Sequence, residues 1–345
     1  MDHDWQSEFA KNASLFPHLA DLQKQQVLLS TMSEAAFRQA SFLDQRIFSP
    51  DLRRQVVSWT DVASIPLPPR SKPQYIFHIG HVGSTLISRL LGEIDSVLAL
   101  REPAILRQLA DLRVTNPAEI GWTEEEQAQR LDQVEGWLSR VFRPEQRVLI
   151  KASSFVSPLA LPLLAKQGTA LFLFTSLERY LQTILAGDSS KQEAAALAEI
   201  RMRRLAKHCG APLGDKDKFS LAQTAALGWL CEMVTLCDAE HHCTEARIAW
   251  LDFDDFLDQP ADHLQRAAGH FERNLSLEEA HDLVSGPIMS RYSKAPEYDY
   301  SASLRAELLA EAGQIHADDI RLTLLWVDQL ARRFPEVAAA IAKAG

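Results

Sequence analysis

The sequence predicts an α/β fold with a mainly parallel sheet, flanked by helices and preceded by a helical extension. Five short apolar runs have the composition of buried parallel strands, and longer amphipathic segments separate them. These runs are residues 75–79, 97–100, 148–150, 170–174 and 248–253. Strands that alternate with helices are typical of α/β domains, which bind their ligands at the carboxyl ends of the strands. We therefore expect the functional site at that edge of the sheet.

Both ends of the chain show the helical spacing of apolar residues. Residues 1–70 are predicted to form a helical extension and a proline-rich linker, since prolines interrupt the pattern after residue 64. Residues 71–300 are assigned to the α/β domain, and residues 301–345 are predicted to form helices packed on it. The N-terminal helices could cover the sheet, form a lid over the site or make a dimer contact, and the sequence leaves these alternatives open.

Composition restricts the classes of partner. The chain has 345 residues, 46% hydrophobic and 24% charged, as in an ordinary globular protein. Its net charge of −10 argues against broad binding to nucleic acids or anionic membranes, since both require a basic surface. No signal peptide or bilayer-spanning apolar run is visible, so a cytoplasmic location is expected. The four cysteines lack a zinc spacing and are predicted to be reduced thiols without a metal.

The segment Tyr75–Leu91 predicts a buried strand, a tight glycine turn and a helix. Gly80 and Gly83 have no Cβ, so the backbone there can adopt positive φ and approach a ligand closely. Ser84 and Thr85 stand at the start of the helix, where N–H groups and the helix dipole favour phosphate or sulfate. The turn is not a Walker A loop, because no lysine precedes the hydroxyl residues.

Four segments in order make the chain resemble a divergent member of the P-loop sulfotransferase superfamily, over roughly residues 75–295. That superfamily has a P-loop NTPase-like sheet and transfers a sulfuryl group from 3′-phosphoadenosine 5′-phosphosulfate (PAPS). The first segment matches the loop that holds the phosphosulfate. The resemblance implies that this group is bound by Gly80, His81, Val82, Gly83, Ser84 and Thr85. His81 stands where the family usually has lysine or arginine.

The second and third segments, residues 98–103 and 147–154, carry the candidate catalytic residues. Glu102 matches a glutamate that serves as the base in the carbohydrate and tyrosyl-protein branches, and Lys151 matches a lysine that stabilises charge on the transferring group. The catalytic histidine of the cytosolic enzymes falls on Ser153. The alternatives are that Glu102 caps a following helix and that Lys151 is a solvated charge.

The fourth segment, residues 170–183, resembles the strand and helix that hold the 3′-phosphate of PAPS. Thr175 occupies the position of the family's arginine, and Thr183 that of its serine. Arg179 lies one helical turn beyond Thr175 and is an alternative source of positive charge.

Two later segments extend the resemblance. Residues 247–260 match a strand followed by aromatic and acidic residues, which supports the fold and says little about chemistry. Arg291 and Lys294 match a late loop that closes over the nucleotide, and are further candidates for the 3′-phosphate; a solvated loop is the alternative.

A basic cluster falls in the mostly helical region 185–245. Its members are Arg201, Arg203, Arg204 and Lys207. We interpret it as a solvated helix face. The acceptor pocket is expected in the variable helices of residues 105–145 and 185–245, whose composition identifies no substrate.

Three functions follow. The first is a sulfotransferase that moves a sulfuryl group from PAPS to a hydroxyl or amine of an unknown small-molecule acceptor, with Glu102 as base and Lys151 stabilising charge. The second is a kinase that uses ATP and magnesium, in which Asp252, Asp254 or Asp255 would have to reach the metal. The third is a non-catalytic nucleotide-binding or anion-binding regulatory protein of the same fold. Oligomeric state stays open.

Overall fold

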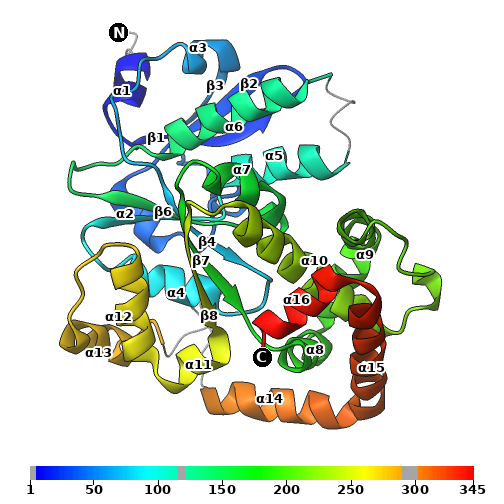
Figure 1. Ribbon diagram of the computed structural model, residues 1–345. Helices are drawn as coiled ribbons and strands as arrows, with labels where there is room; N and C mark the ends of the chain where they lie inside the picture. Colours follow the sequence, from blue (N-terminus) through cyan, green and yellow to red (C-terminus); the bar gives the residue numbers. More distant parts are fainter. Residues whose placement is uncertain (1–4, 116–120, 290–301) are drawn as a thin grey trace.

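The computed structural model describes residues 5–115, 121–289 and 302–345 (Figure 1). Its centre is a five-stranded parallel sheet with the strand order β5-β6-β4-β7-β8. The strands are β4 (Gln74–His78), β5 (Val97–Arg101), β6 (Arg147–Lys151), β7 (Thr169–Phe174) and β8 (Arg247–Asp252). The predicted α/β class and parallel sheet are confirmed, and each predicted strand agrees with an observed one to within about a residue.

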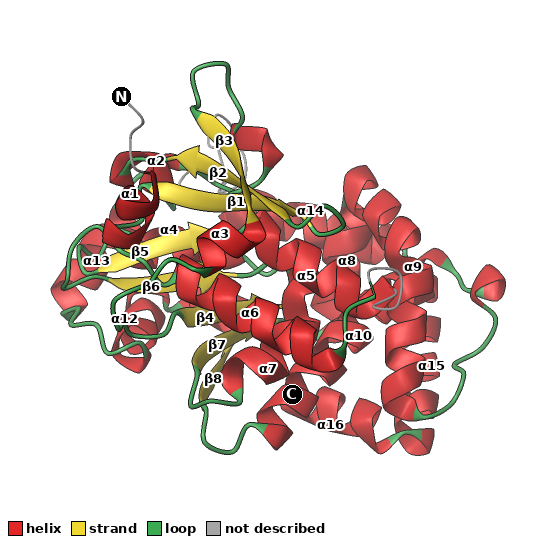
Figure 2. Ribbon diagram, turned by 90° about the horizontal axis from the view of Figure 1, so that it is seen from above, coloured by secondary structure: helices red, strands yellow, loops and turns green. Residues whose placement is uncertain are grey.

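The sheet is covered on both faces, which explains its continuous apolar strands. Figure 2 shows α4 (Ser84–Leu91), α12 (Pro260–His270) and α13 (Leu277–Ser285) on one side of it. The other side carries α5 (Ala104–Thr115), α6 (Glu124–Leu138), α7 (Ala160–Leu164) and α10 (Leu221–His242), together with the 3₁₀ helix η3 (Ser154–Leu159). All five residues of β5 are buried, as such a two-sided cover requires.

The strand order identifies β4 as the switch point of the sheet. After β4 the chain moves to β5 and returns to β6 on one side, and it then places β7 and β8 on the other side. Crevices at the carboxyl end of such a strand are the usual ligand sites of open α/β sheets. The glycine turn that follows β4 therefore stands at the expected place.

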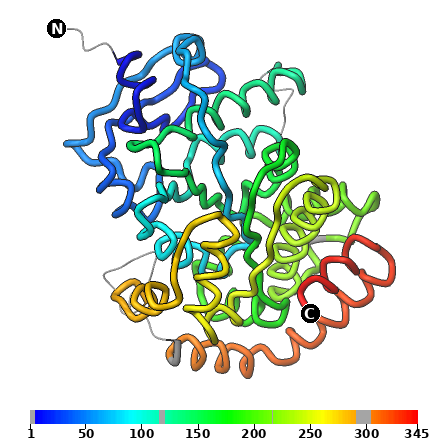
Figure 3. Tube along the Cα trace, turned by 60° about the vertical axis from the view of Figure 1, so that its left-hand side comes forward, coloured from blue at the N-terminus to red at the C-terminus, as the bar shows by residue number. Residues whose placement is uncertain are grey.

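The C-terminal helices pack against the helical half of the molecule. This half contains α8 (Leu177–Ala186), α9 (Asp188–Cys209), the 3₁₀ helix η4 (Lys216–Lys218), α14 (Ala302–Ile315), α15 (Ala317–Arg333) and α16 (Pro335–Lys343). The helix α14 packs on α8, while α15 and α16 pack on α10. Figure 3 shows these orange and red helices running beside the green part of the chain. Among the helices that the structure describes, none has the length and apolarity needed to cross a bilayer.

The expectation that residues 1–70 form a helical extension is wrong. This region forms an antiparallel sheet with the order β1-β2-β3, in addition to short helices. The strands are β1 (Leu15–Asp21), β2 (Gln26–Thr31) and β3 (Arg54–Ser58), and the helices are α1 (Trp5–Lys11), α2 (Glu34–Gln39), η1 (Gln45–Ile47) and α3 (Trp59–Ala63). In β2 Val27 and Leu29, two residues apart, are both fully buried, as the period of a strand requires, and Ser30 is buried as well. The turn between β1 and β2 contains neither glycine nor proline, so the sequence lacked the usual hairpin signal.

The N-terminal sheet is anchored on α5 and on the segment that follows α6. The backbone of Ala20 in β1 exchanges two hydrogen bonds with the side chain of Gln108 in α5, of 2.8 and 2.7 Å. The buried guanidinium of Arg140 donates to the carbonyls of Phe9, Asn12 and Leu15. Residues 40–46 are held against the end of β5 by Arg101, whose guanidinium donates to the Ala40 carbonyl at 2.7 Å and whose carbonyl accepts from the Leu43 N–H at 2.7 Å.

Candidate functional site

The carboxyl edge of the parallel sheet brings the predicted site residues into one row. Glu102 follows β5 directly, Lys151 ends β6, the turn at 79–83 follows β4, and Thr175 follows β7. The short helix α11 (Phe253–Asp258) begins directly after β8, at the end of this row. Ser84 and Thr85 begin α4 directly after the turn, while two predicted site residues, Arg179 and Thr183, lie within α8.

The turn after β4 has the backbone shape that its glycines predicted. The φ angles of Gly80, His81 and Gly83 are 90°, 57° and 61°, all in the left-handed region. A Cβ atom on Gly83 would lie 1.9 Å from the ring of Phe253, so both the backbone angle and the space require glycine there. Gly83 is the N-cap of α4 and offers no side chain to cap it. The first N–H groups of α4 consequently lack a side-chain cap, which favours an anion at this point.

Two hydroxyl groups beside this turn have unused hydrogen-bonding capacity. The Oγ1 atom of Thr85 and the Oγ atom of Ser153 are buried, and neither has a partner among the residues that the structure describes. The next residue, Ser154, adjoins the turn, since a Cβ on Gly80 would lie 3.6 Å from its Oγ. A buried hydroxyl without a partner costs about 1–3 kcal/mol. A bound oxyanion would remove that cost.

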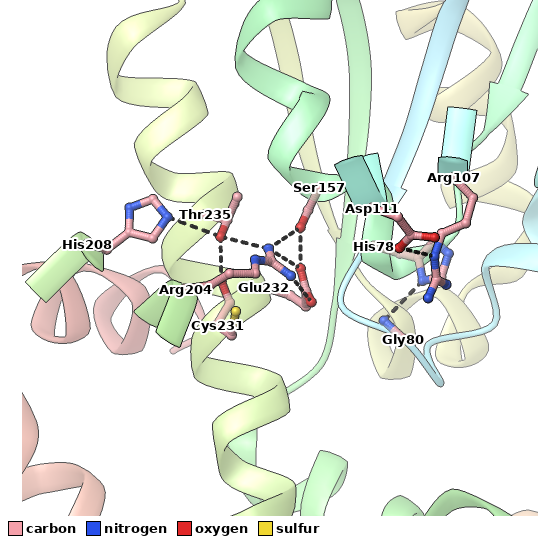
Figure 4. Close-up of polar contacts among 10 residues, drawn as sticks. All are labelled: His78, Gly80, Arg107, Asp111, Ser157, Arg204, His208, Cys231, Glu232 and Thr235. Carbon is pink, nitrogen blue, oxygen red and sulfur yellow. Dashed lines mark hydrogen bonds and ion pairs between the residues drawn. The ribbon is translucent and has the colours of Figure 1, made fainter. Parts of the chain in front are cut away.

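His78 stabilises the turn through two hydrogen bonds. The Gly80 N–H donates to His78 Nδ1 at 3.0 Å, and His78 Nε2 donates to the Ala152 carbonyl at 2.9 Å. Figure 4 shows the contact between His78 and Gly80. These two bonds specify the neutral tautomer with its proton on Nε2. Gly80 thus contributes backbone shape, while its N–H is already used.

His81 and Val82 contribute less than the resemblance implied. His81 Nε2 lies 3.8 Å from a carboxylate oxygen of Glu193 in α9, so the basic position of the loop faces an acidic side chain. The His81 ring also meets Tyr180 edge-on, at 6.4 Å between ring centres. Burial raises the pKa of Tyr180 to about 12, so this phenol is neutral. The Val82 side chain is buried in the core, which leaves only its backbone for a ligand.

Glu102 and Lys151 form an ion pair across two adjacent strands. The Nζ of Lys151 donates to Glu102 Oε1, and the Glu102 N–H donates to the Lys151 carbonyl at 2.7 Å. The Lys151 side chain is fully buried, while that of Glu102 keeps 19% of its surface exposed. The alternative of a solvated lysine is therefore wrong. Glu102 has φ 53°, an unfavourable angle for this residue type, so the local backbone holds its side chain where it stands.

A loop of the N-terminal region completes the surroundings of this pair. The guanidinium carbon of Arg46 lies 3.5 Å from the centre of the Phe42 ring, and its Nη2 lies 4.0 Å from Glu102 Oε2. The Lys151 Nζ is 5.9 Å from the same ring. Sequence reasoning missed Phe42 and Arg46 because no motif marks them. Their place follows from the pairing of Leu43 with the end of β5.

The end of β7 differs from the expected 3′-phosphate site. The Thr175 hydroxyl donates to Asp254 Oδ2 at 2.6 Å. Arg179 Nε lies 3.5 Å from the same oxygen, and Arg305 Nη1 donates to Asp254 Oδ1 at 2.8 Å. Arg179 does bring positive charge to Thr175, and the Asp254 carboxylate is shared between it and Arg305. The Thr183 hydroxyl donates to the Arg179 carbonyl within α8, at 2.8 Å. Arg291 and Lys294 lie outside the described residues.

Two of the three aspartates of the kinase alternative are engaged elsewhere, and the third, Asp255, is exposed. Asp252 caps α11 by accepting from the Asp254 N–H at 2.7 Å, and burial raises the pKa of its carboxyl. Asp254 is shared among Thr175 and two arginines. Over residues 5–115, 121–289 and 302–345, no group of three His, Cys, Asp or Glu side chains could hold a metal ion. All four cysteines are free thiols, and burial raises the pKa of Cys231 to about 12.

The chain was compared with known proteins. No protein family profile matches it, and no curated protein matches. It is similar in structure to the sulfotransferase domain from the curacin biosynthetic pathway, with a TM-score of 0.40, 12% identity, and coverage of 72% of this chain and 99% of that one. It is also similar to a sulfotransferase from Alicyclobacillus acidocaldarius, with a TM-score of 0.38, 13% identity, and coverage of 74% and 99%. This likeness concerns the fold alone, and the assignments below rest on this chain's own geometry.

Proposed function

We propose that this protein transfers a sulfuryl group from an adenosine phosphosulfate donor to a hydroxyl or amine of a small acceptor. The observation that carries the proposal is the Glu102–Lys151 ion pair, which lies at the same sheet edge as the uncapped start of α4. A carboxylate and a buried cation beside an anion-binding turn are what a transfer between an anionic donor and a protic acceptor requires.

The turn and the start of α4 bind the anionic part of the donor. The uncapped N–H groups and the helix dipole attract it, and the free Thr85 and Ser153 hydroxyls donate to its oxygens. PAPS or a related phosphosulfate supplies the activated sulfuryl group when it is bound. Because Gly83 and Phe253 fix the turn, these donors need little rearrangement to act.

Glu102 accepts the proton of the acceptor hydroxyl or amine at its carboxylate. Lys151 holds this carboxylate in position and, being fully buried, keeps a positive charge beside the reacting group without competing solvent. As Glu102 becomes protonated, its ion pair weakens, and Lys151 becomes free to stabilise negative charge on the transferring group. The acceptor oxygen or nitrogen forms a bond to sulfur as the bond between sulfur and the donor's phosphate oxygen breaks. The adenosine phosphate leaves as an anion, and the acceptor's proton stays on Glu102 until water removes it.

The residues fit one end of PAPS and not the other. The phosphosulfate end fits the turn, the uncapped helix and the two unpartnered hydroxyls. The 3′-phosphate end does not fit at Thr175, because a phosphate there would meet the Asp254 carboxylate among its own cations. We therefore propose a donor whose 3′-phosphate adds no affinity at this position, and we assign no role to Thr175 in binding it.

The second candidate is a non-catalytic anion-binding protein of the same fold. Its support is that the loop's basic position, His81, stands beside Glu193, and that the Gly80 N–H is bound to His78. Both features lower the affinity that the turn is expected to have for a highly charged donor. Anion binding without any transfer would favour this candidate.

The test uses two hydroxyl deletions on the same helix. Thr85→Val removes the hydroxyl beside the turn, while Ser88→Ala removes another unpartnered hydroxyl one helical turn further on. We expect calorimetric titration with adenosine 5′-phosphosulfate to show about tenfold weaker binding for Thr85→Val, since a hydrogen bond to a charged group contributes about 1.5–3 kcal/mol. Ser88→Ala should bind as the parent does. Equal affinity for all three proteins would contradict the placement of the donor at α4.

A further inference from the structure

A cavity of about 570 Å³ lies away from the carboxyl edge of the sheet, between the end of α5, the 3₁₀ helix η3 and the helices α9 and α10. Its volume is within the usual range for small-molecule pockets. Its lining is strongly basic. The charged residues that line it are Arg113, Arg203, Arg204, Lys207 and Asp238. Four cations thus share this cavity with a single carboxylate, in a chain whose net charge is −10.

The basic cluster of α9 was interpreted as a solvated face, and the structure corrects this for two of its four members. Arg201 and Arg204 are buried, with 4% and 9% of their surface exposed. Positions 200, 203, 204, 207 and 208 of α9 all line the cavity. They recur at the spacing of one helix face, so the side chains project into the same space. Three members of the cluster, Arg203, Arg204 and Lys207, therefore line the cavity, and Arg203 and Lys207 are also exposed to solvent.

Arg204 is held in place by hydrogen bonds, and its charge is balanced by a carboxylate. Its guanidinium donates to both carboxylate oxygens of Glu232, at 2.9 and 3.0 Å, and to the hydroxyls of Ser157 and Thr235, at 2.8 and 3.2 Å (Figure 4). The Ser157 hydroxyl donates in turn to Glu232. The adjacent carboxylate raises the pKa of Arg204, although burial opposes this. Arg204 shapes the cavity, and its charge is balanced by Glu232.

The charge available to a ligand comes from Arg113, Arg203 and Lys207. The closest carboxylate to Arg203 in an ion pair is that of Glu199, at 4.0 Å, and the one carboxylate in the lining, that of Asp238, also contacts His242 at 3.2 Å. Within the described part of the chain, no ion pair is recorded for Arg113 or Lys207. Burial lowers the pKa of the neighbouring His208, so this ring is neutral near pH 7 and serves as a hydrogen-bonding group.

We propose that this cavity binds a small molecule that carries two or more oxyanion groups. Arg113 and Arg203 present planar forks, and Lys207 a point charge, which together suit phosphate or carboxylate oxygens spaced a few ångströms apart. Ser157 and Thr235 lie on the same wall, and their hydroxyls are already used, since they donate to Glu232 and to the Cys231 carbonyl. The site does not depend on the proposed transfer, because Glu102, Lys151 and the turn after β4 do not line the cavity.

The test is calorimetric titration of the full chain with pyrophosphate and, separately, with citrate. We expect binding that weakens when the salt concentration rises from about 0.02 M to about 0.2 M, since the cations are partly exposed. The double variant Arg203→Gln with Lys207→Gln should bind at least about tenfold more weakly. A control with the same change of charge, Arg321→Gln with Arg332→Gln on the exposed surface of α15, should bind as the parent does.

Thr85→Val separates this cavity from the transfer site. Retained pyrophosphate binding in Thr85→Val, together with its loss in the α9 double variant, would support the cavity. Loss in Thr85→Val alone would place the anion at α4 and overturn the proposal. The proposal would also be overturned if neither pyrophosphate nor citrate binds, or if binding decreases equally in the α9 and α15 variants. Thermal unfolding of each variant verifies that the fold is intact. The relative response to pyrophosphate and citrate distinguishes a phosphate ligand from a carboxylate ligand.

Discussion

The two ends of the carboxyl edge of the parallel sheet pair a carboxylate with cations in different ways. At β5 and β6, Glu102 contacts one buried lysine, and 19% of its side chain is exposed. At β7 and β8, Asp254 is shared by the Thr175 hydroxyl, Arg179 and Arg305. The first carboxylate has oxygen lone pairs left for a proton, while the second has its oxygens occupied. We therefore assign the proposed chemistry to the first end, while the contacts of the second end join α8, α11 and α14.

The largest expected effect is the loss of turnover when the first carboxylate is replaced. Glu102→Gln keeps the size of the side chain and removes its basicity, so transfer should fall by about 10²–10⁴-fold. Affinity for adenosine 5′-phosphosulfate should change little, because Glu102 does not belong to the donor turn. The matched control is Glu178→Gln, an exposed glutamate in the first turn of α8. Transfer is followed by chromatography of the nucleotide product, and unchanged turnover in Glu102→Gln would remove its role as base.

The second-largest effect is expected on the stability of the protein when the Glu102–Lys151 pair is broken. Lys151→Met leaves the Glu102 carboxylate without its buried partner, which we expect to cost about 3 kcal/mol in the free energy of unfolding. The double variant with Glu102→Gln should recover part of that loss, since no charge is then left unpaired. Urea unfolding of the parent, the two single variants and the double variant gives the coupling energy. An additive outcome would mean that the two side chains do not interact.

A smaller effect is expected at the second end, where we expect the Asp254 carboxylate to lower the affinity for a nucleotide that carries a 3′-phosphate. Asp254→Asn keeps the shape and leaves Arg179 and Arg305 without their shared carboxylate. Affinity for adenosine 3′,5′-bisphosphate should rise by about tenfold relative to adenosine 5′-phosphate, a change of about 1.4 kcal/mol. The neighbouring Asp255→Asn, which is exposed, makes the same change of charge and should not alter the ratio. An identical ratio in both variants would show that Asp254 does not exclude the phosphate.

The smallest effect is expected for the contribution of the N-terminal loop. Arg46→Ala removes a side chain that is 57% exposed and 4.0 Å from Glu102. Exposed ion pairs contribute about 0.2–1 kcal/mol, so turnover should change by about twofold to fivefold. Steady-state kinetics measures this change. A loss as large as that of Glu102→Gln would mean that Arg46 contacts the substrate directly.

The sequence predicted what is local and missed what depends on distant contacts. The parallel strands, the positive φ at Gly80 and Gly83, and the positions of Glu102 and Lys151 all follow from short segments. Arg46 lies 56 residues before Glu102, and Arg305 lies 51 residues beyond Asp254, so no short pattern links either pair.

The same difference explains the errors. The N-terminal region was assigned helices because its turn between β1 and β2 has no glycine or proline, and the strand pairing that overrides helical spacing is tertiary information. The basic cluster of α9 was assigned to solvent because the sequence does not show that Glu232, 28 residues after Arg204, lies opposite it. Burial of a charge becomes predictable only when its partner is known.

The most direct test of the account is a crystal structure of the protein with adenosine 5′-phosphosulfate at saturating concentration. The account predicts the phosphosulfate at the start of α4, with oxygens within hydrogen-bond distance of the Thr85 hydroxyl and close to the Glu102–Lys151 pair. Asp254 should remain bonded to Thr175 and Arg305. A donor bound away from α4, with Thr85 still unpartnered, would contradict the central claim that this edge of the sheet is the transfer site.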